Sequence, residues 1–314
     1  MGGADGLALF FFEKFTDWHS MRNFTQFTCI DWSGAKSRWH KGIAVASCRL
    51  GADAPSLIPP PDRHWTRSAI LDWLRKQADS GQDMLIGLDL SFGLPFADQQ
   101  AFFPQWHESP ADAKALWELI DCTCADDSHL AATSFISHAD FRRHFRHSKD
   151  DTGDLFVGGL GRLRLVEHHQ RETRQANSAS CFNLVGAAQV GKSSLTGMRI
   201  LHQLDGAIPI WPFDLVPDYG PVIVEIYTSI AARASMVLAG GKSKITDAKT
   251  LDAALHSFQS DAHTPMSGRY TDHATDSILT AAWLRQEAKN LEFWKPKLMT
   301  DEIAQTEGWT FGVS

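Results

Sequence analysis

The sequence predicts an α/β fold in which a mixed β-sheet is flanked by helices, and three observations carry this prediction. Apolar runs typical of buried strands occur at 27–31, 84–90 and 222–227. Residues 65–78 and 271–287 instead place apolar side chains at helical spacing. The chain has 314 residues, of which 43% are hydrophobic and 21% charged, so it can bury a substantial core.

The first half of the predicted sheet begins with a hairpin. FTCID at 27–31 and GIAVASC at 42–48 are β-branched and apolar, and a short polar turn joins them. This pattern predicts two antiparallel neighbouring strands. A short third strand at 57–58 is ended by the three prolines at 59–61, which cannot continue a ladder.

A helix and a central strand follow the hairpin. Thr66 is the expected N-cap of the helix at 65–78, and Ser80-Gly81 supplies its end. MLIGLDL at 84–90 is almost entirely apolar, as expected for a strand that is buried on both faces.

The regular pattern weakens in the middle of the chain, which predicts a large insertion into the sheet domain. Helices are expected at 111–120 and 194–204, and Trp211-Pro-Phe213 is expected to anchor the insertion against the core. We therefore divide the chain into a poorly ordered leader at 1–20, a core at 21–95 and 218–290, an insertion or cap at 96–217, and a C-terminal extension at 291–314. Met21 is an alternative start.

Composition excludes several classes of protein. A net charge of -7 and a pI near 6.0 argue against a protein that coats nucleic acid non-specifically. Five cysteines without a CxxC pair predict neither a disulfide framework nor a zinc site, and favour a reducing compartment such as the cytoplasm. No apolar run reaches the roughly 20 residues of a membrane span, so we expect no membrane partner. Oligomeric state is not indicated.

Acidic residues interrupt the apolar elements at five positions. Asp31 ends the first strand, Asp89 lies in the central strand, and Glu225 interrupts VIVEIY. Asp272 and Asp276 are one helical turn apart and share a face. A carboxylate in such a place is costly unless it is paired or bound to a cation. Each acid could instead cap a turn, and Asp272 could be the N-cap of its helix.

Clustered carboxylates suit Mg²⁺ or Mn²⁺, because hard cations take oxygen ligands. Two such ions about 3.5–4 Å apart activate water and stabilise the leaving oxygen of a phosphodiester. The acids therefore favour metal-assisted phosphoryl chemistry.

Four segments carry a resemblance to a known family. CIDWSGAK, GLDLSFGLP, VIVEIYTS and TDHATDSILTAAWL resemble the motifs of the DUF429 group of predicted nucleases, within the ribonuclease H-like superfamily. The resemblance covers about half of the chain. Two positions depart from the family pattern, which more often has proline where Ser91 and Thr228 stand.

The resemblance implies a fold and a site. It implies a ribonuclease H-like, five-stranded mixed sheet flanked by helices, with a large insertion. It assigns the catalytic, metal-binding roles to Asp31, Asp89 and Asp276. Auxiliary roles fall to Glu225, Asp272 and His273, the last because HATD resembles the H-x-x-D helix of Holliday-junction resolvases, and Lys36 is expected near phosphate.

A competing motif lies within the insertion. The run from Gly186 to Ser193 matches the P-loop pattern G-x-x-x-x-G-K-S, follows an apolar FNLV and precedes a predicted helix. Gly186, Gly191, Lys192 and Ser193 would then bind the phosphates of ATP or GTP. Two strand-like motifs precede this run, however, and Glu225 stands where a Walker-B Asp is expected. The alternative is a Gly-containing loop in which Lys192 meets a substrate phosphate.

Two further interpretations remain open. Asp31 followed by a Gly-containing turn also occurs in sugar kinases and actin-like ATPases, which need a duplicated domain, and no second copy is visible here. The basic residues at 142–149, together with Arg162 and Arg164, favour a solvated surface, although a phosphate-contacting cap is an alternative.

We expect a divalent-metal-dependent nuclease or phosphodiesterase acting on DNA, RNA or a small phosphoester; the alternative is a non-catalytic binding module.

Overall fold

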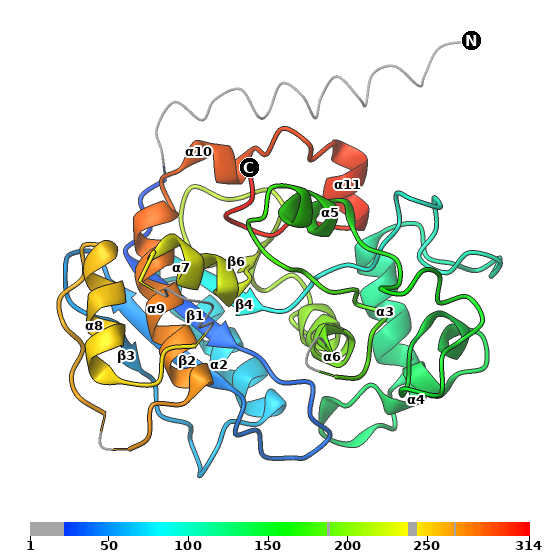
Figure 1. Ribbon diagram of the computed structural model, residues 1–314, viewed down its shortest axis with the longest axis horizontal. Helices are drawn as coiled ribbons and strands as arrows, with labels where there is room; N and C mark the ends of the chain where they lie inside the picture. Colours follow the sequence, from blue (N-terminus) through cyan, green and yellow to red (C-terminus); the bar gives the residue numbers. More distant parts are fainter. Residues whose placement is uncertain (1–21, 187–188, 238–243, 267) are drawn as a thin grey trace.

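A mixed β-sheet forms the centre of the protein in this computed structural model, which describes residues 22–186, 189–237, 244–266 and 268–314 (Figure 1). The leader expected at 1–20 and the alternative start Met21 lie outside the described residues. The strands are β1 Gln26–Asp31, β2 Ala44–Arg49, β3 Ser56–Leu57, β4 Met84–Asp89, β5 Ile210–Trp211 and β6 Val222–Glu225. Within the described ranges these six strands lie in the order β3-β2-β1-β4-β6-β5.

Strand directions confirm the predicted hairpin and the central strand. β1 pairs antiparallel with β2, which in turn pairs antiparallel with β3. On the other side β1 pairs parallel with β4, β4 with β6, and β6 with β5. Because β1, β4 and β6 are parallel, their carboxyl ends meet at one edge of the sheet.

Helices cover both faces of this sheet (Figure 1). The helices are α2 Arg67–Ser80, α3 Ala113–Thr123, α4 Thr133–Ser137, α5 Leu165–Glu172, α6 Val190–Gln203, α7 Thr228–Ala234, α8 Ala248–Ser257, α9 Asp272–Glu287, α10 Leu291–Trp294 and α11 Asp301–Thr306, with short 3₁₀ turns at Ser128–Leu130 and Phe141–His144. None of the helices in the described part of the chain is long and apolar enough to cross a membrane.

Alternation along the strands divides the interior into two hydrophobic cores. Ile30 of β1 and Ile86 of β4 pack with residues of α2, α3 and α6. Cys29 of β1 and Leu85 of β4 face the opposite side, where residues of α7, α8 and α9 cover them. The period of two in a strand therefore decides which helix layer each strand residue meets.

The predicted cap residues at both ends of helix α2 are confirmed. The Thr66 hydroxyl accepts a hydrogen bond from Ala69 N at 3.0 Å, which caps the amino end of α2. Gly81 closes the other end in the left-handed conformation at φ 60°, which glycine adopts without steric cost.

The expectation of five strands was wrong by one strand, because the inserted segment contributes β5. Ile210 and Trp211 lie between Pro209 and Pro212, so this strand is too short to show a period in the sequence. The predicted helices of the insertion form as α3 and α6, and their apolar side chains share one core with Ile30 and Ile86. The insertion and the sheet thus bury their apolar side chains together.

A buried ion cluster joins three distant segments. Arg164, which is 1% exposed, donates hydrogen bonds to Glu225 Oε1 at 2.6 Å and Oε2 at 2.8 Å. It also donates to Glu167 Oε1 at 2.9 Å and to the Glu307 carbonyl at 2.9 Å. Burial lowers the pKa of this guanidinium, but the charges of Glu225 and Glu167 outweigh burial and hold the pKa well above its ordinary value. The expectation that Arg164 lies on a solvated surface was therefore wrong. Its side chain is buried, and its charge neutralises the buried carboxylates of Glu167 and Glu225.

We predict that Arg164→Met lowers the free energy of unfolding by about 3–5 kcal/mol, because it leaves two carboxylates buried without their cation. Urea denaturation measures the change. Arg143→Met is the matched control, since Arg143 pairs with Asp154 at the exposed surface, and it should change stability little. Equal effects of the two substitutions would contradict a structural role for the buried cluster.

Candidate functional site

The two central acids of the site stand side by side. Asp31 ends β1, Asp89 ends β4, and the parallel register places these two residues directly opposite each other. Adjacent strands are about 4.8 Å apart, so the two carboxyl groups start from neighbouring backbone positions. Asp31 shares its strand face with Cys29, and both acids therefore lie on the side of the sheet that α9 covers.

Helix α9 brings further polar groups to the same place. Thr271 caps this helix by accepting a hydrogen bond from Ala274 N at 3.3 Å, so the alternative that Asp272 is the N-cap was wrong. His273 in the first turn places Nδ1 3.2 Å from Oδ1 and 3.3 Å from Oδ2 of Asp31. Asp276 follows on the same face, where the charge of Asp31 acts on it.

The acids perturb one another's protonation. Burial raises the pKa of Asp276 to about 7, and the negative charges of Asp31 and Asp272 add to the rise. Burial followed by the charge of Asp31 raises the pKa of Asp89 well above its ordinary value, and burial raises the pKa of Asp31. Like charges held together in a poorly solvated place disfavour ionisation. The cluster therefore favours a bound proton or cation.

Two cationic groups face these acids. Lys244 forms an ion pair with Asp272, and the charges of Asp276 and Asp31 also contribute to raising the pKa of Lys244. The pKa of His273 is raised, chiefly by its hydrogen bond to Asp31. Sequence reasoning missed Lys244, because it lies 28 residues before Asp272 and belongs to no recognisable motif.

The remaining predicted auxiliary acid has a different place. Glu225 is opposite Leu88 rather than Asp89 in the β4–β6 register, so its side chain points to the other face of the sheet. Its carboxylate accepts hydrogen bonds from Arg164, from Thr310 Oγ1 at 2.6 Å and from Phe92 N at 2.7 Å. The expected auxiliary role of Glu225 beside the metal-binding acids is therefore corrected, because Glu225 belongs to the buried ion cluster.

Thr228 donates two hydrogen bonds to the carboxylate of Asp89; it is one of the two positions at which the sequence departs from the DUF429 motifs that it resembles. Thr228 N lies 3.2 Å from Asp89 Oδ1, and Thr228 Oγ1 donates to Oδ2 at 3.2 Å. Both bonds lower the pKa of Asp89 against the stronger effect of burial. A proline in this position would lack both donors.

The donor chemistry fits a hard divalent cation, although the arrangement shown holds no ready-made metal site. Asp31, Asp89 and Asp276 supply carboxylate oxygens, the ligands that Mg²⁺ and Mn²⁺ prefer. Across the four described ranges, however, no group of three His, Cys, Asp or Glu side chains is placed to hold a metal ion. His273 and Thr228 occupy carboxylate oxygens of Asp31 and Asp89. Binding would require these side chains to readjust.

The P-loop motif lacks the strand that it needs. FNLV at 182–185 is irregular and makes an isolated bridge at Asn183, while α6 begins only at Val190. Gly186 has a φ of 78°, Ala187 and Ala188 lie outside the described residues, and a Cβ at Gly191 would approach the Cys181 carbonyl to 2.2 Å. Gly191 thus serves close packing against a neighbouring backbone.

Both lysines expected near phosphate lie on one side of α6. Lys36 and Lys192 line the same shallow groove, next to Ala132 and Leu195. Gly34 permits this contact, because a Cβ there would sit 2.5 Å from Ser193 N. The turn after β1 therefore packs on the first turn of α6, and Ser193 also lines a second, deeper cavity beside Asp89.

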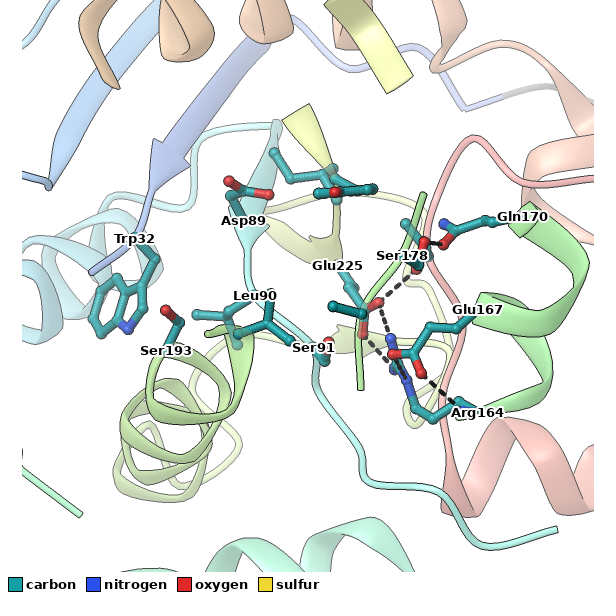
Figure 2. Close-up of a pocket in the computed structure, with 15 residues that line it drawn as sticks. Trp32, Asp89, Leu90, Ser91, Arg164, Glu167, Gln170, Ser178, Ser193 and Glu225 are labelled. Atoms are coloured by element: carbon teal, nitrogen blue, oxygen red, sulfur yellow. Dashed lines mark hydrogen bonds and ion pairs between the residues drawn. The ribbon is translucent and has the colours of Figure 1, made fainter. Parts of the chain in front are cut away.

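This deeper cavity opens at the carboxyl ends of β4 and β6 and has a volume of about 140 Å³ (Figure 2). Asp89, Trp32, Ser193, Gln170 and Glu225 are among the residues that line it. Ligands of open α/β sheets commonly bind outside the carboxyl ends of strands, so its position is typical of a substrate site.

Comparisons with models of protein families, with curated proteins and with solved structures found no match.

We predict that Asp276→Asn stabilises the metal-free protein in a pH-dependent way. Because the pKa of Asp276 is raised to about 7, the folded state holds its proton more tightly than the unfolded state, and stability falls as pH rises from about 4 to about 7. The amide cannot ionise, so the variant should exceed the wild type by roughly 1–3 kcal/mol at pH 8 and by little at pH 4.

Unfolding in urea across this pH range, with chelator present, measures the difference between the two proteins. The exposed Asp150 provides the control, since Asp150→Asn replaces a solvated side chain and should change stability little. A pH-independent difference for Asp276→Asn would show that burial and the neighbouring charges do not raise the pKa of this carboxyl group.

Proposed function

We propose that the protein is a divalent-metal-dependent phosphodiesterase or nuclease whose active site is formed by Asp31, Asp89 and Asp276. The observation that carries the proposal is the direct opposition of Asp31 and Asp89 at the ends of adjacent parallel strands. Asp276 lies near enough for the charge of Asp31 to add to the effect of burial, which raises the pKa of Asp276. Carboxylates so arranged are costly without a cation, and a cation at a strand edge is suited to phosphoryl chemistry.

The sheet supports the same proposal. An antiparallel hairpin leads into parallel strands, and the three family-like strand motifs end at Asp31, Asp89 and Glu225 along one edge. Helix α9, which carries the fourth motif, packs on β1 and β2 beside that edge. This arrangement is compatible with a ribonuclease H-like core of five strands that is extended by β5, and we include that core in the proposal.

Each residue receives a role from its position. Asp31, Asp89 and Asp276 would hold Mg²⁺ or Mn²⁺, which supplies an activated water and neutralises charge on the phosphate. Thr228 orients Asp89, and Lys244 holds Asp272 beside the cluster. His273 holds Nδ1 against the carboxylate of Asp31, and this hydrogen bond is the chief cause that raises the pKa of the imidazole. Lys36 and Lys192 would meet phosphate groups of the substrate beyond the acids.

We predict that Mn²⁺ raises the melting temperature of the wild type and supports hydrolysis of bis(p-nitrophenyl) phosphate. Saturation at about 100 times Kd would add about 2.7 kcal/mol to stability. Asp31→Asn should abolish the Mn²⁺ shift and lower kcat/KM by more than about 100-fold. Loss of a residue that merely hydrogen-bonds a metal ligand usually lowers activity by about 10–100-fold, and loss of the ligand itself should have a larger effect. Thermal denaturation and release of p-nitrophenolate provide the measurements.

Asp31→Asn should itself be no less stable than the wild type without metal, since it removes one charge from the cluster. This property separates loss of activity from loss of folding. Asp150→Asn should behave as the wild type in both assays. Absence of a Mn²⁺ shift in the wild type, or full activity of Asp31→Asn, would overturn the proposed function.

A further inference from the structure

The cavity beside Asp89 has features of a pocket for one ring-shaped group. Figure 2 shows Trp32 and Ser193 on one side of the view and Gln170 with Ser178 on the other, with Asp89 between them. Its apolar lining includes Trp32 and Tyr227, and Trp32 is held by a hydrogen bond from Nε1 to Thr196 Oγ1 at 3.1 Å. Aromatic side chains present flat faces on which a ring can stack.

The cavity is lined by a buried side-chain amide, that of Gln170, whose nitrogen has no hydrogen-bond partner among the described residues. Gln170 is 1% exposed, and the nitrogen concerned is Nε2. The Ser178 hydroxyl donates to Gln170 Oε1, which orients the amide and leaves the N–H groups of Nε2 as the unused side. Buried donors are almost always satisfied, so this exception points to a ligand that presents an acceptor.

Gln170 shares one face of α5 with Glu167, three residues earlier. Both line the cavity, but they differ in their hydrogen bonding. Glu167 is occupied by Arg164, whose Nε donates to it at 2.9 Å, and by the backbone N of the same residue at 2.8 Å. One residue on this face is thus used to stabilise the fold, while the other offers a donor to the cavity.

The side chains that line the cavity favour a neutral occupant over an anionic one. Asp89, Glu167 and Glu225 contribute three carboxyl groups against the single guanidinium of Arg164, which already donates to two of them. A phosphate placed here would meet repulsion, whereas a neutral ring would not. The phosphate would instead lie at the cation beside Asp89.

We infer that this cavity binds the nucleobase of a nucleotide whose phosphate lies at the carboxylate cluster. This inference rests on the proposed function, and it narrows the substrate from phosphodiesters in general to nucleotides. The base stacks against the aromatic lining, and a ring carbonyl or ring nitrogen accepts a hydrogen bond from Gln170 Nε2.

Calorimetric titration of the full-length wild type tests the inference with two ligands, thymidine 5′-monophosphate and 2-deoxyribose 5-phosphate, each with and without Mn²⁺. The nucleotide should bind about 10-fold or more tightly than the base-free sugar phosphate, since stacking of one base has an effect of this order. Equal affinities would overturn the inference. This comparison needs no variant and is unaffected by any loss of folding.

Gln170→Met adds the residue-level test, because it keeps the length of the side chain and removes the donor. It should weaken binding of the nucleotide about 3–10-fold and leave the affinity for 2-deoxyribose 5-phosphate unchanged. Gln77→Met, on the distant helix α2 where Nε2 bonds the Trp73 carbonyl, should match the wild type. Wild-type affinity of Gln170→Met for the nucleotide would overturn the role of Gln170.

Failure of this inference is distinguishable from failure of the proposed function. Mn²⁺-dependent hydrolysis of bis(p-nitrophenyl) phosphate without any preference for the nucleotide would remove the base pocket and keep the phosphodiesterase. A Gln170-dependent preference for the nucleotide without hydrolysis of either p-nitrophenyl or nucleotide esters would keep the pocket and remove the enzyme.

Discussion

Parallel pairing of β1 with β4 places Asp31 opposite Asp89, and the rest of the candidate site depends on this register. Side chains alternate between the faces of a strand, so a slip of one residue would turn Asp31 toward α2 and α6 and leave Asp89 without its neighbour. In the observed register both acids meet α9, which supplies His273 and Asp276 from its first turns. Burial raises the pKa values of Asp89 and Asp276, and the charge of Asp31, which this pairing holds nearby, adds to both rises.

A second constraint lies across the sheet, where Arg164 binds Glu225 and Glu167 away from solvent. These groups belong to the inserted segment and to β6, and the backbone of Glu307 joins them from the C-terminal region. Removing one partner of such a cluster is expensive, so the cluster ties the wall of the cavity to the sheet. Two kinds of buried carboxylate therefore occur at neighbouring strand ends: those neutralised by arginine stabilise the fold, and those held together by the register favour an added cation.

Much of the fold could be predicted from local patterns. The hairpin, the helix capped by Thr66 and Gly81, the central strand and the long helix at 271–287 all form within a few residues of their expected positions. β5 could not be predicted, because two residues between prolines show no period. The P-loop alternative lacks the strand that normally precedes such a loop, because FNLV lies outside the sheet, and a short motif carries no information on this context. For the candidate site, the sequence indicates Asp31, Asp89 and Asp276, whereas Lys244, Thr228 and Gln170 carry no local signal and are brought in by the tertiary structure.

The sequence by itself determined the elements and the acids that end them, because periodicity, caps and apolar runs are local properties of the chain. Tertiary structure decided which acids act together. Glu225 and Asp89 have the same appearance in the sequence, as lone acids in apolar strands, yet the β4–β6 register sends Glu225 to Arg164 and Asp89 to the side of Asp31. The distinction depends on the pairing of β1 with β4 and of β4 with β6, strands that lie far apart in the sequence, and no local pattern records such a pairing.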